Sequence, residues 1–197
     1  HRQGRSRDKV KVLLLCAGTD SRDLSLANLI KRTGADAENW DLQNGPQFDI
    51  ADDATWDPLV ARVRAKEYAA AFASPPCTTA SRLRNKPGGP PPLRGLVGAD
   101  RYGLKGLSIP NKELVRLHNL ILVRVAEILM IMTDRGLPWV FETPALREGE
   151  VSVLRLDEYS TLMDRSGVQH IVGIQCPFGS MSLKPTSWVS HLANMDD

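Results

Sequence analysis

The stretch Ala69-Ala-Ala-Phe-Ala-Ser-Pro-Pro-Cys77 decides the fold that we expect for this chain. Its apolar part, residues 69–73, has the length of a buried strand. Proline has no backbone N–H to donate to a sheet, so the strand ends before Pro75 and Pro76. Cys77 is therefore expected at the edge of a sheet. In open α/β sheets, ligands bind at that edge, outside the carboxyl ends of the strands.

Strand and helix patterns alternate on both sides of this stretch. We expect strands at residues 10–15, 38–42, 48–50, 69–73, 139–142 and 168–174, with 187–192 pairing with the last as a hairpin. Helices are expected at residues 23–33, 54–67, 112–134 and 157–165. This alternation predicts an α/β fold with a doubly wound, mostly parallel sheet and a C-terminal antiparallel hairpin.

Size and composition favour one intracellular domain. The chain has 197 residues, of which 42% are hydrophobic, and its net charge is only +2. We expect a basic N-terminal tail at residues 1–9 and a single domain at 10–197. Cys16, Cys77 and Cys176 are too few for a disulfide scaffold and lack zinc spacing, which predicts reduced thiols in the cytoplasm or nucleus. No stretch has the pattern of a membrane span or a signal peptide, so no membrane partner is expected.

A long basic segment, residues 78–111, follows the candidate cysteine and contains the Pro/Gly-rich run Pro87–Pro92. Long loops without regular structure are usually functional or disordered. One interpretation is a solvated surface loop; the other is a mobile loop that closes over a polyanion. Its position directly after Cys77 favours the second, with nucleic-acid contacts from Ser81, Arg82, Arg84, Lys86, Arg94, Arg101 and Lys105.

Several polar residues stand where the expected strands end, as a nucleotide-like ligand requires. Gly18, in the turn after the first strand, allows a ligand to approach the backbone closely. Asp41 ends the second strand, where a carboxylate accepts hydrogen bonds from a ribose, although it could equally cap a turn. Asp49 and Ile50 follow, suited to hold the amino group and the ring of an adenine.

Cys77 and Glu142 are the candidates for chemistry. The prolines beside Cys77 argue against a buried role for its thiol, which would otherwise be the ordinary interpretation of a free cysteine. Glu142 ends the apolar run Trp139-Val-Phe. Burial at such a position favours a carboxyl group that holds a proton near neutral pH, although it could also be a structural acid in an ion pair.

The ordered set of motifs resembles the DNA cytosine-5 methyltransferase family, especially its short phage and mobile-element members. Ser74-Pro-Pro-Cys-Thr-Thr-Ala-Ser81 is similar to the family's Pro-Cys motif, and Phe141-Glu-Thr-Pro144 to its Glu-Asn motif. Leu15–Ser21 resembles the cofactor turn, and Asp49-Ile50 the segment at the adenine. Gln175-Cys-Pro-Phe-Gly, with Lys184-Pro-Thr186, resembles a late motif of the phage-type enzymes.

This resemblance implies a class I methyltransferase fold, S-adenosyl-L-methionine as the methyl donor and DNA as the substrate. In the family's mechanism a cysteine thiolate adds to carbon 6 of cytosine, which activates carbon 5 for methylation, and the target base is flipped out of the duplex. Cys77 would be the nucleophile, and Glu142 would act at N3 of the base. No metal is implied, and the implied cofactor-binding residues are Cys16, Ala17, Gly18, Thr19, Asp41, Asp49, Ile50, Ser74 and Pro75.

The family pattern is incomplete in this chain. Thr143 stands in place of an asparagine, Asp20 in place of a glycine, and no separate target-recognition domain is found. A protein partner or a second copy could supply the missing elements. Three alternatives stay open: an impaired nucleic-acid-binding module, an RNA cytosine-5 methyltransferase, and another cysteine enzyme such as a hydrolase. His118, His170 and His191 give the hydrolase no recognisable partner base.

Overall fold

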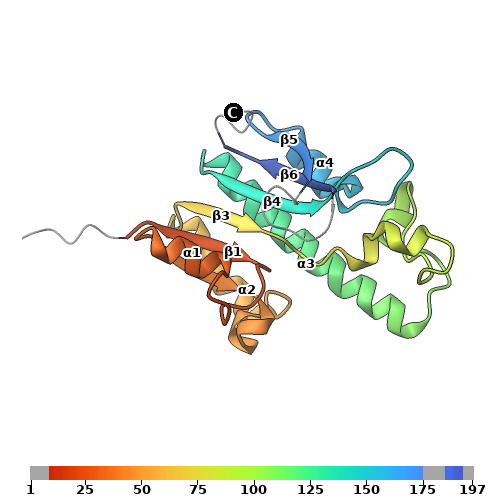
Figure 1. The fold of residues 1–197 in the computed structure, drawn as a ribbon, viewed down its shortest axis with the longest axis horizontal. Helices are drawn as coiled ribbons and strands as arrows, with labels where there is room; N and C mark the ends of the chain where they lie inside the picture. The colour runs from red at the N-terminus through yellow and green to blue at the C-terminus, as the bar shows by residue number, and fades with distance from the viewer. Residues whose placement is uncertain (1–8, 175–184, 193–197) are drawn as a thin grey trace, which may run out of the picture.

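The computed structural model of the protein describes residues 9–174 and 185–192 and has an α/β architecture (Figure 1). Its centre is a six-stranded mixed sheet in the order β2-β1-β3-β4-β6-β5. The strands are β1 (Lys11–Leu15), β2 (Asp36–Trp40), β3 (Ala70–Ala73), β4 (Trp139–Pro144), β5 (Gln169–Ile174) and β6 (Pro185–Ser190).

The first four strands form the parallel part of the sheet, and the last two form the antiparallel part. Strand β1 pairs in parallel with β2 and β3, and β3 pairs in parallel with β4. Strand β6 lies between β4 and β5 and is antiparallel to both. The α/β class and the C-terminal antiparallel hairpin predicted from the sequence are therefore confirmed.

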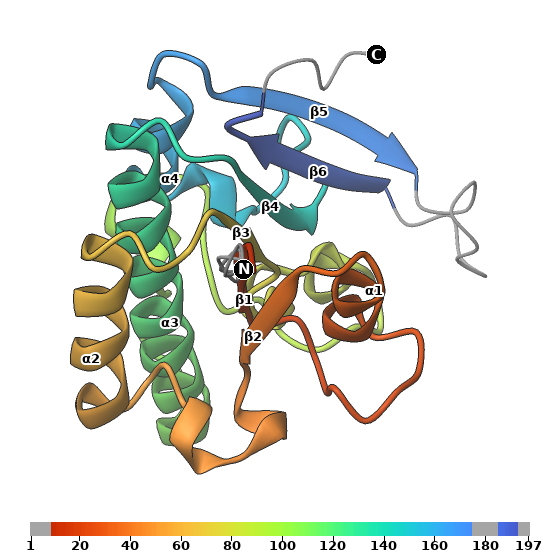
Figure 2. The ribbon, with the colours of Figure 1, turned by 90° about the vertical axis from the view of Figure 1, so that its left-hand side faces the viewer.

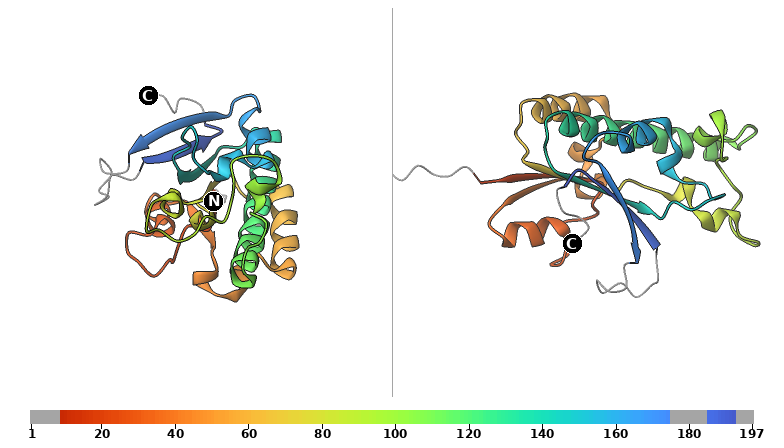
Figure 3. Two further views of the ribbon diagram at one scale, coloured as in Figure 1. Left: turned by 90° about the vertical axis from the view of Figure 1, so that its right-hand side faces the viewer. Right: turned by 90° about the horizontal axis from the view of Figure 1, so that it is seen from above.

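Four α-helices flank the sheet: α1 (Leu26–Arg32), α2 (Asp53–Arg64), α3 (Ile109–Asp134) and α4 (Asp157–Met163). Seen along the sheet, α1 lies on one face, and α2, α3 and α4 lie on the other (Figures 2 and 3). The side chains of β1 alternate accordingly. Leu13 and Leu15 join the core formed with α2 and α3, whereas Leu14 packs on the α1 side with Ala27 and Ala37. This alternation is the period-two pattern of a strand buried on both faces.

Local signals set the ends of the helices. The Ser25 hydroxyl accepts a hydrogen bond from Asn28 N at 3.2 Å and begins α1, and Asp52 does the same for Ala54 N at the start of α2. Helix α3 ends at Asp134 and is followed by Gly136, whose φ of +65° favours glycine. Glycine there and Pro138 two residues later were the stop signals expected from the sequence.

Two sequence expectations are wrong. No strand forms at residues 48–50; the chain makes a 3-10 turn at Pro46–Phe48 instead, after Gly45 with φ of +127°. A glycine with positive φ followed by a proline is typical of a turn rather than of a ladder. The basic segment is not structureless, because it contains 3-10 turns at Thr78–Ala80, Arg82–Asn85 and Gly98–Tyr102. Most of the late motif, residues 175–184 with Cys176, and tail residues 1–8 lie outside the described residues.

Candidate functional site

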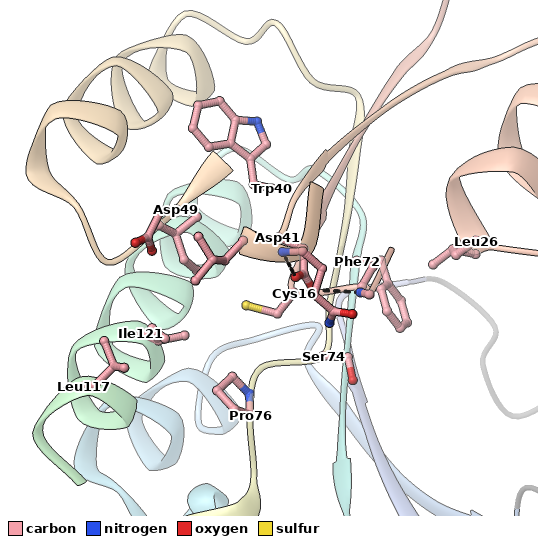
Figure 4. A pocket seen from close by; sticks show the side chains of 15 residues that line it. Cys16, Leu26, Trp40, Asp41, Asp49, Phe72, Ser74, Pro76, Leu117 and Ile121 are labelled. Atoms are coloured by element: carbon pink, nitrogen blue, oxygen red, sulfur yellow. Dashed lines mark hydrogen bonds between the residues drawn. The ribbon is translucent and has the colours of Figure 1, made fainter. Parts of the chain in front are cut away.

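A cavity of about 710 Å³ lies at the carboxyl ends of β1, β2 and β3 (Figure 4). It is the position at which ligands bind in open α/β sheets. Most of the cofactor-binding residues expected from the sequence line it: Cys16, Ala17, Gly18, Asp41, Asp49, Ile50 and Ser74. Of the other two, Thr19 borders a smaller adjoining cavity, and Pro75 precedes Pro76, which does line the main one.

The turn after β1 is held in place by hydrogen bonds with β2 and with the turn that follows β2. Gly18 has φ of +81°, and its N–H donates to Asp41 Oδ2 at 2.8 Å. The Asn39 side chain donates to Gly18 O at 2.7 Å, and that of Asn44 donates to the same oxygen at 3.2 Å. A backbone fixed in this way presents a fixed surface to a ligand, since few of its torsions are left to order on binding.

Asp41 has the capping role that was one of the two suggested by its sequence position. It caps the 3-10 turn Leu42–Asn44, with Oδ1 accepting from Gln43 N at 2.9 Å, while Oδ2 accepts from Gly18 N. Each carboxylate oxygen has a second lone pair. Asp41 can therefore fasten the two turns and still accept hydrogen bonds from a ligand in the cavity.

The second acidic residue of the cavity, Asp49, is held by a similar local bond. Its Oδ1 accepts from Ala51 N at 2.8 Å, which makes a turn where the sequence predicted the end of a strand. Ile50 is buried, and its carbonyl accepts from Arg124 of α3 at 2.8 Å. Both residues line the cavity, but the strand predicted for them from the sequence is absent.

Sequence reasoning missed the apolar wall of the cavity. Leu117 and Ile121 of α3 line it opposite the strand ends, in the region that Figure 4 shows beside Asp49. Leu26, Trp40 and Phe72 add further apolar surface. The spacing of four between Leu117 and Ile121 was the available signal, because it places both on one face of a helix.

Cys16 lies in the cavity wall and is not suited to be a nucleophile. Its sulfur points into the cavity in Figure 4. Burial, aided by the negative charges of Asp41 and Asp49, raises the pKa of the Cys16 thiol to about 12. The thiolate is the reactive form of cysteine, so Cys16 stays a neutral wall residue at physiological pH.

Glu142 meets the edge of the cavity through Ser74. Ala73 of β3 is in register with Phe141 of β4, so the next residues, Ser74 and Glu142, lie side by side. Ser74 Oγ donates to Glu142 Oε2 at 2.5 Å, at the short end of the range for hydroxyl donors. Glu142 is only 9% exposed. The structure therefore brings together one predicted catalytic residue and one predicted cofactor-binding residue.

Cys77 begins the turn beyond the cavity. Pro76 lines the cavity, and Cys77, the next residue, is half-buried and starts the 3-10 turn Thr78–Ala80, with Ala80 N donating to its carbonyl at 2.9 Å. The prolines thus end β3 as expected and lead the chain from the cavity to Cys77. This arrangement places the cysteine beside the cavity rather than in the core.

Three arginines of the basic loop are used to hold the loop itself. Arg94 is only 3% exposed, and it donates to Thr79 Oγ1 at 3.0 Å and to Arg101 O at 2.9 Å. Burial lowers its pKa to about 10. Arg84 donates to the carbonyls of Thr78 and Pro91. Arg101 pairs with Asp157 at 2.7 Å.

These internal contacts leave fewer loop cations for a polyanion than the sequence suggested. Arg94 is enclosed, so it is not offered to a phosphate in this conformation. Ser81 caps the turn Arg82–Asn85 by accepting from Leu83 N at 3.3 Å. Arg82 is half-exposed, and Lys86 and Lys105 are exposed.

Comparisons with known proteins give no family for the chain: no protein-family model, curated protein or solved structure matches it. Among residues 9–174 and 185–192, no helix combines the length and the hydropathy that a membrane span requires. The same residues contain no cluster of three or more His, Cys, Asp or Glu side chains that could hold a metal ion.

Proposed function

We propose that the protein transfers a methyl group from S-adenosyl-L-methionine to carbon 5 of cytosine in DNA. The observation that carries the proposal is the bond between Ser74 and Glu142 at the edge of the 710 Å³ cavity. It joins the candidate cofactor site to the candidate base site. The mixed sheet, with antiparallel β6 between β4 and β5, is compatible with the α/β fold that the resemblance implies.

The residues of the cavity fit the proposed methyl donor. Its volume lies within the range of small-molecule sites, about 300–1,000 Å³. Asp41 and Asp49 supply acceptors suited to ribose hydroxyls and to an amino group. Ile50, Leu117 and Ile121 supply apolar surface suited to a flat aromatic ring. When bound, S-adenosyl-L-methionine supplies an electrophilic methyl group on a sulfonium centre.

In this proposal Cys77 and Glu142 act on the base. The Cys77 thiolate forms a bond to carbon 6 of cytosine, which leaves carbon 5 electron-rich and able to accept the methyl group. Glu142 lies at the N3 side of the ring, where a proton held between its carboxyl group and N3 stabilises the adduct. A base then takes the carbon 5 proton, and the electrons of that bond re-form the double bond between carbons 5 and 6 as the bond to sulfur breaks. This step releases the methylated base and the Cys77 thiolate.

Ser74 holds Glu142 for this role. Its hydroxyl donates to Oε2, which helps to fix the orientation of the carboxyl plane. The serine comes directly after β3 and the glutamate lies within β4, so the pair is set by the rigid sheet rather than by a loop. A carboxyl group positioned before the substrate arrives needs little reorganisation during the reaction.

The test is a titration followed by a transfer assay. Calorimetry with S-adenosyl-L-methionine is expected to show binding, and labelled methyl groups are expected to appear in mixed-sequence DNA. Cys77→Ser should abolish transfer while leaving the affinity for the methyl donor unchanged. Transfer to RNA but not to DNA would reassign the substrate. Absence of donor binding would remove every methyltransferase assignment, whereas donor and DNA binding without transfer would identify an impaired relative.

A further inference from the structure

A second cavity, of about 470 Å³, lies between the turn Tyr102–Leu107 and the N-terminal half of α3. The side chains of Leu117 and Ile121 point to the main cavity, and this one uses other positions of the same helix. It lies within the segment that follows Cys77, and the chemistry proposed above does not use it. Its lining residues are Tyr102, Gly103, Leu104, Lys105, Gly106, Leu107, Lys112, Val115, Arg116 and Asn119.

The charge of this lining is entirely positive. It contains Lys105, Lys112 and Arg116 and no acidic side chain. In the part of the chain that the structure describes, neither lysine forms an ion pair. Arg116 contacts Glu113 at 2.8 Å, but both side chains are more than half exposed, so solvent screens that pair. The cavity therefore favours an anion.

The turn that forms the cavity is fixed before any ligand binds. Asn119 Nδ2 donates to Tyr102 O at 2.7 Å, which ties the turn to α3. The Tyr102 hydroxyl donates to Glu158 at 2.7 Å and accepts from Asp157 N at 2.9 Å. Gly103, with φ of +146°, passes so close to α3 that an added Cβ would lie 3.0 Å from Val115 Cγ1. Lys105 is thus carried on a rigid support.

One lining group, the side-chain oxygen of Asn119, indicates that the ligand also carries a hydrogen-bond donor. Asn119 Oδ1 is buried and has no hydrogen-bond partner among the described residues. A buried acceptor without a donor destabilises the free protein. A ligand with an N–H or O–H group beside its negative charge would satisfy this oxygen. A nucleotide of a DNA strand has both, with N–H groups on its base and negative charge on its phosphate.

The cavity is linked to the turn of Cys77 by the buried Arg94. Arg94 donates to Thr79 Oγ1, in the 3-10 turn that Cys77 begins, and to Arg101 O, directly before Tyr102. The two turns are therefore joined through one side chain. A phosphate held in the cavity would keep a fixed position relative to Cys77.

We infer that this cavity binds a backbone phosphate of the nucleic-acid strand and sets the position of that strand relative to Cys77. The phosphate chemistry rests on the cavity alone, whereas the choice of a nucleic-acid strand rests on the proposed function. Lys105 and Lys112 make the phosphate contacts, and Asn119 accepts from the adjoining nucleotide.

The experiment measures binding without turnover, in the Cys77→Ser protein. Anisotropy of a labelled duplex is recorded over a series of salt concentrations for this protein and for its Lys105→Gln/Lys112→Gln derivative. Each lost phosphate contact reduces the steepness of the negative slope of log K against log salt by about 0.9. The slope of the derivative is therefore expected to be less negative by about 1.8. The matched control, Lys31→Gln/Lys66→Gln, removes two exposed lysines elsewhere and should leave the slope unchanged.

Amide spectra identify the occupant. A short oligonucleotide should shift the Gly103 and Gly106 signals of the Cys77→Ser protein, with smaller shifts in the Lys105→Gln/Lys112→Gln derivative. An unchanged salt slope in that derivative would overturn the inference. So would shifts produced by inorganic phosphate or an acidic peptide but not by the oligonucleotide. This experiment measures no methyl transfer. A protein that fails the transfer assay can still show the expected salt slope and amide shifts, so failure of the proposed function and failure of this inference are distinguishable.

Discussion

The bond from Ser74 to Glu142 gives the sharpest prediction. Ser74→Ala removes a hydroxyl that donates to a buried carboxyl group at 2.5 Å. Leaving a buried polar group without its hydrogen-bond partner costs roughly 1–3 kcal/mol. Expressed fully in the transition state, this loss lowers the rate of methyl transfer by about fivefold to about 150-fold. Ser74→Thr keeps the hydroxyl and is expected to retain most of the rate.

Single-turnover transfer from labelled S-adenosyl-L-methionine to DNA measures this rate, and calorimetry measures the affinity for the methyl donor. The affinity should change less than about threefold in Ser74→Ala, because the lost bond is made to Glu142 rather than to the donor. An unchanged rate would show that the bond does not position Glu142. If weaker binding of the methyl donor explained the whole loss of rate, Ser74 would have only the cofactor-binding role expected from the sequence.

Three further predictions concern titration. Cys16, whose thiol has a pKa of about 12, is expected to resist iodoacetamide at pH 8 when the other two cysteines are replaced by serine, since only about one thiol in 10⁴ is ionised; rapid alkylation seen by mass spectrometry would contradict its buried setting. Burial, with the charges of Arg94 and Arg84, lowers the pKa of His118 to about 4. As the pH falls from about 6.5 towards about 4, His118 therefore binds a proton in the unfolded chain but not in the folded protein, so stability in urea should fall over this range. The fall should be smaller in His118→Gln. Burial opposes ionisation of Glu38, but the hydrogen bonds and charge of Arg62 outweigh burial and lower the pKa of Glu38. The ionised Glu38 then contributes about 1 kcal/mol to the free energy of unfolding above about pH 4.5, and this contribution is lost as the pH falls through the lowered pKa. In Glu38→Gln, the stability measured in urea should therefore depend less on pH below about 4.5.

The parts of the fold that were predicted from the sequence are those with local signals. The prolines after Ala73 ended β3 as expected, and Gly136 with Pro138 ended α3. Asp41 was placed at the correct strand end because carboxyl ends of parallel strands gather at one edge. The error at residues 48–50 was also local. Phe48-Asp-Ile has the composition of a strand, but Gly45 and Asp49 each bend the backbone.

The rest of the candidate site depends on contacts between distant segments, which periodicity does not encode. Asp20 looked like a departure from a glycine-rich turn. In the structure its carboxylate accepts from Asn39 and its N–H donates to Asn44, so side chains of the neighbouring strand and turn stabilise a backbone that has one glycine fewer. The bond from Ser74 to Glu142 joins residues 68 positions apart and follows from the register of β3 and β4.

The basic loop illustrates why counting charges misjudges a surface. The sequence offered Arg94 as a phosphate ligand, yet its guanidinium is enclosed between Thr79 and Arg101 O and joins the Cys77 turn to the turn that carries Lys105. Replacing Arg94 would therefore displace both turns at once, whereas replacing Lys105 removes only an exposed charge. Loss of DNA binding in an Arg94 variant would reflect this displacement. The electrostatic contribution of the loop must instead be measured at Lys105 and Lys112, whose removal leaves its internal hydrogen bonds intact.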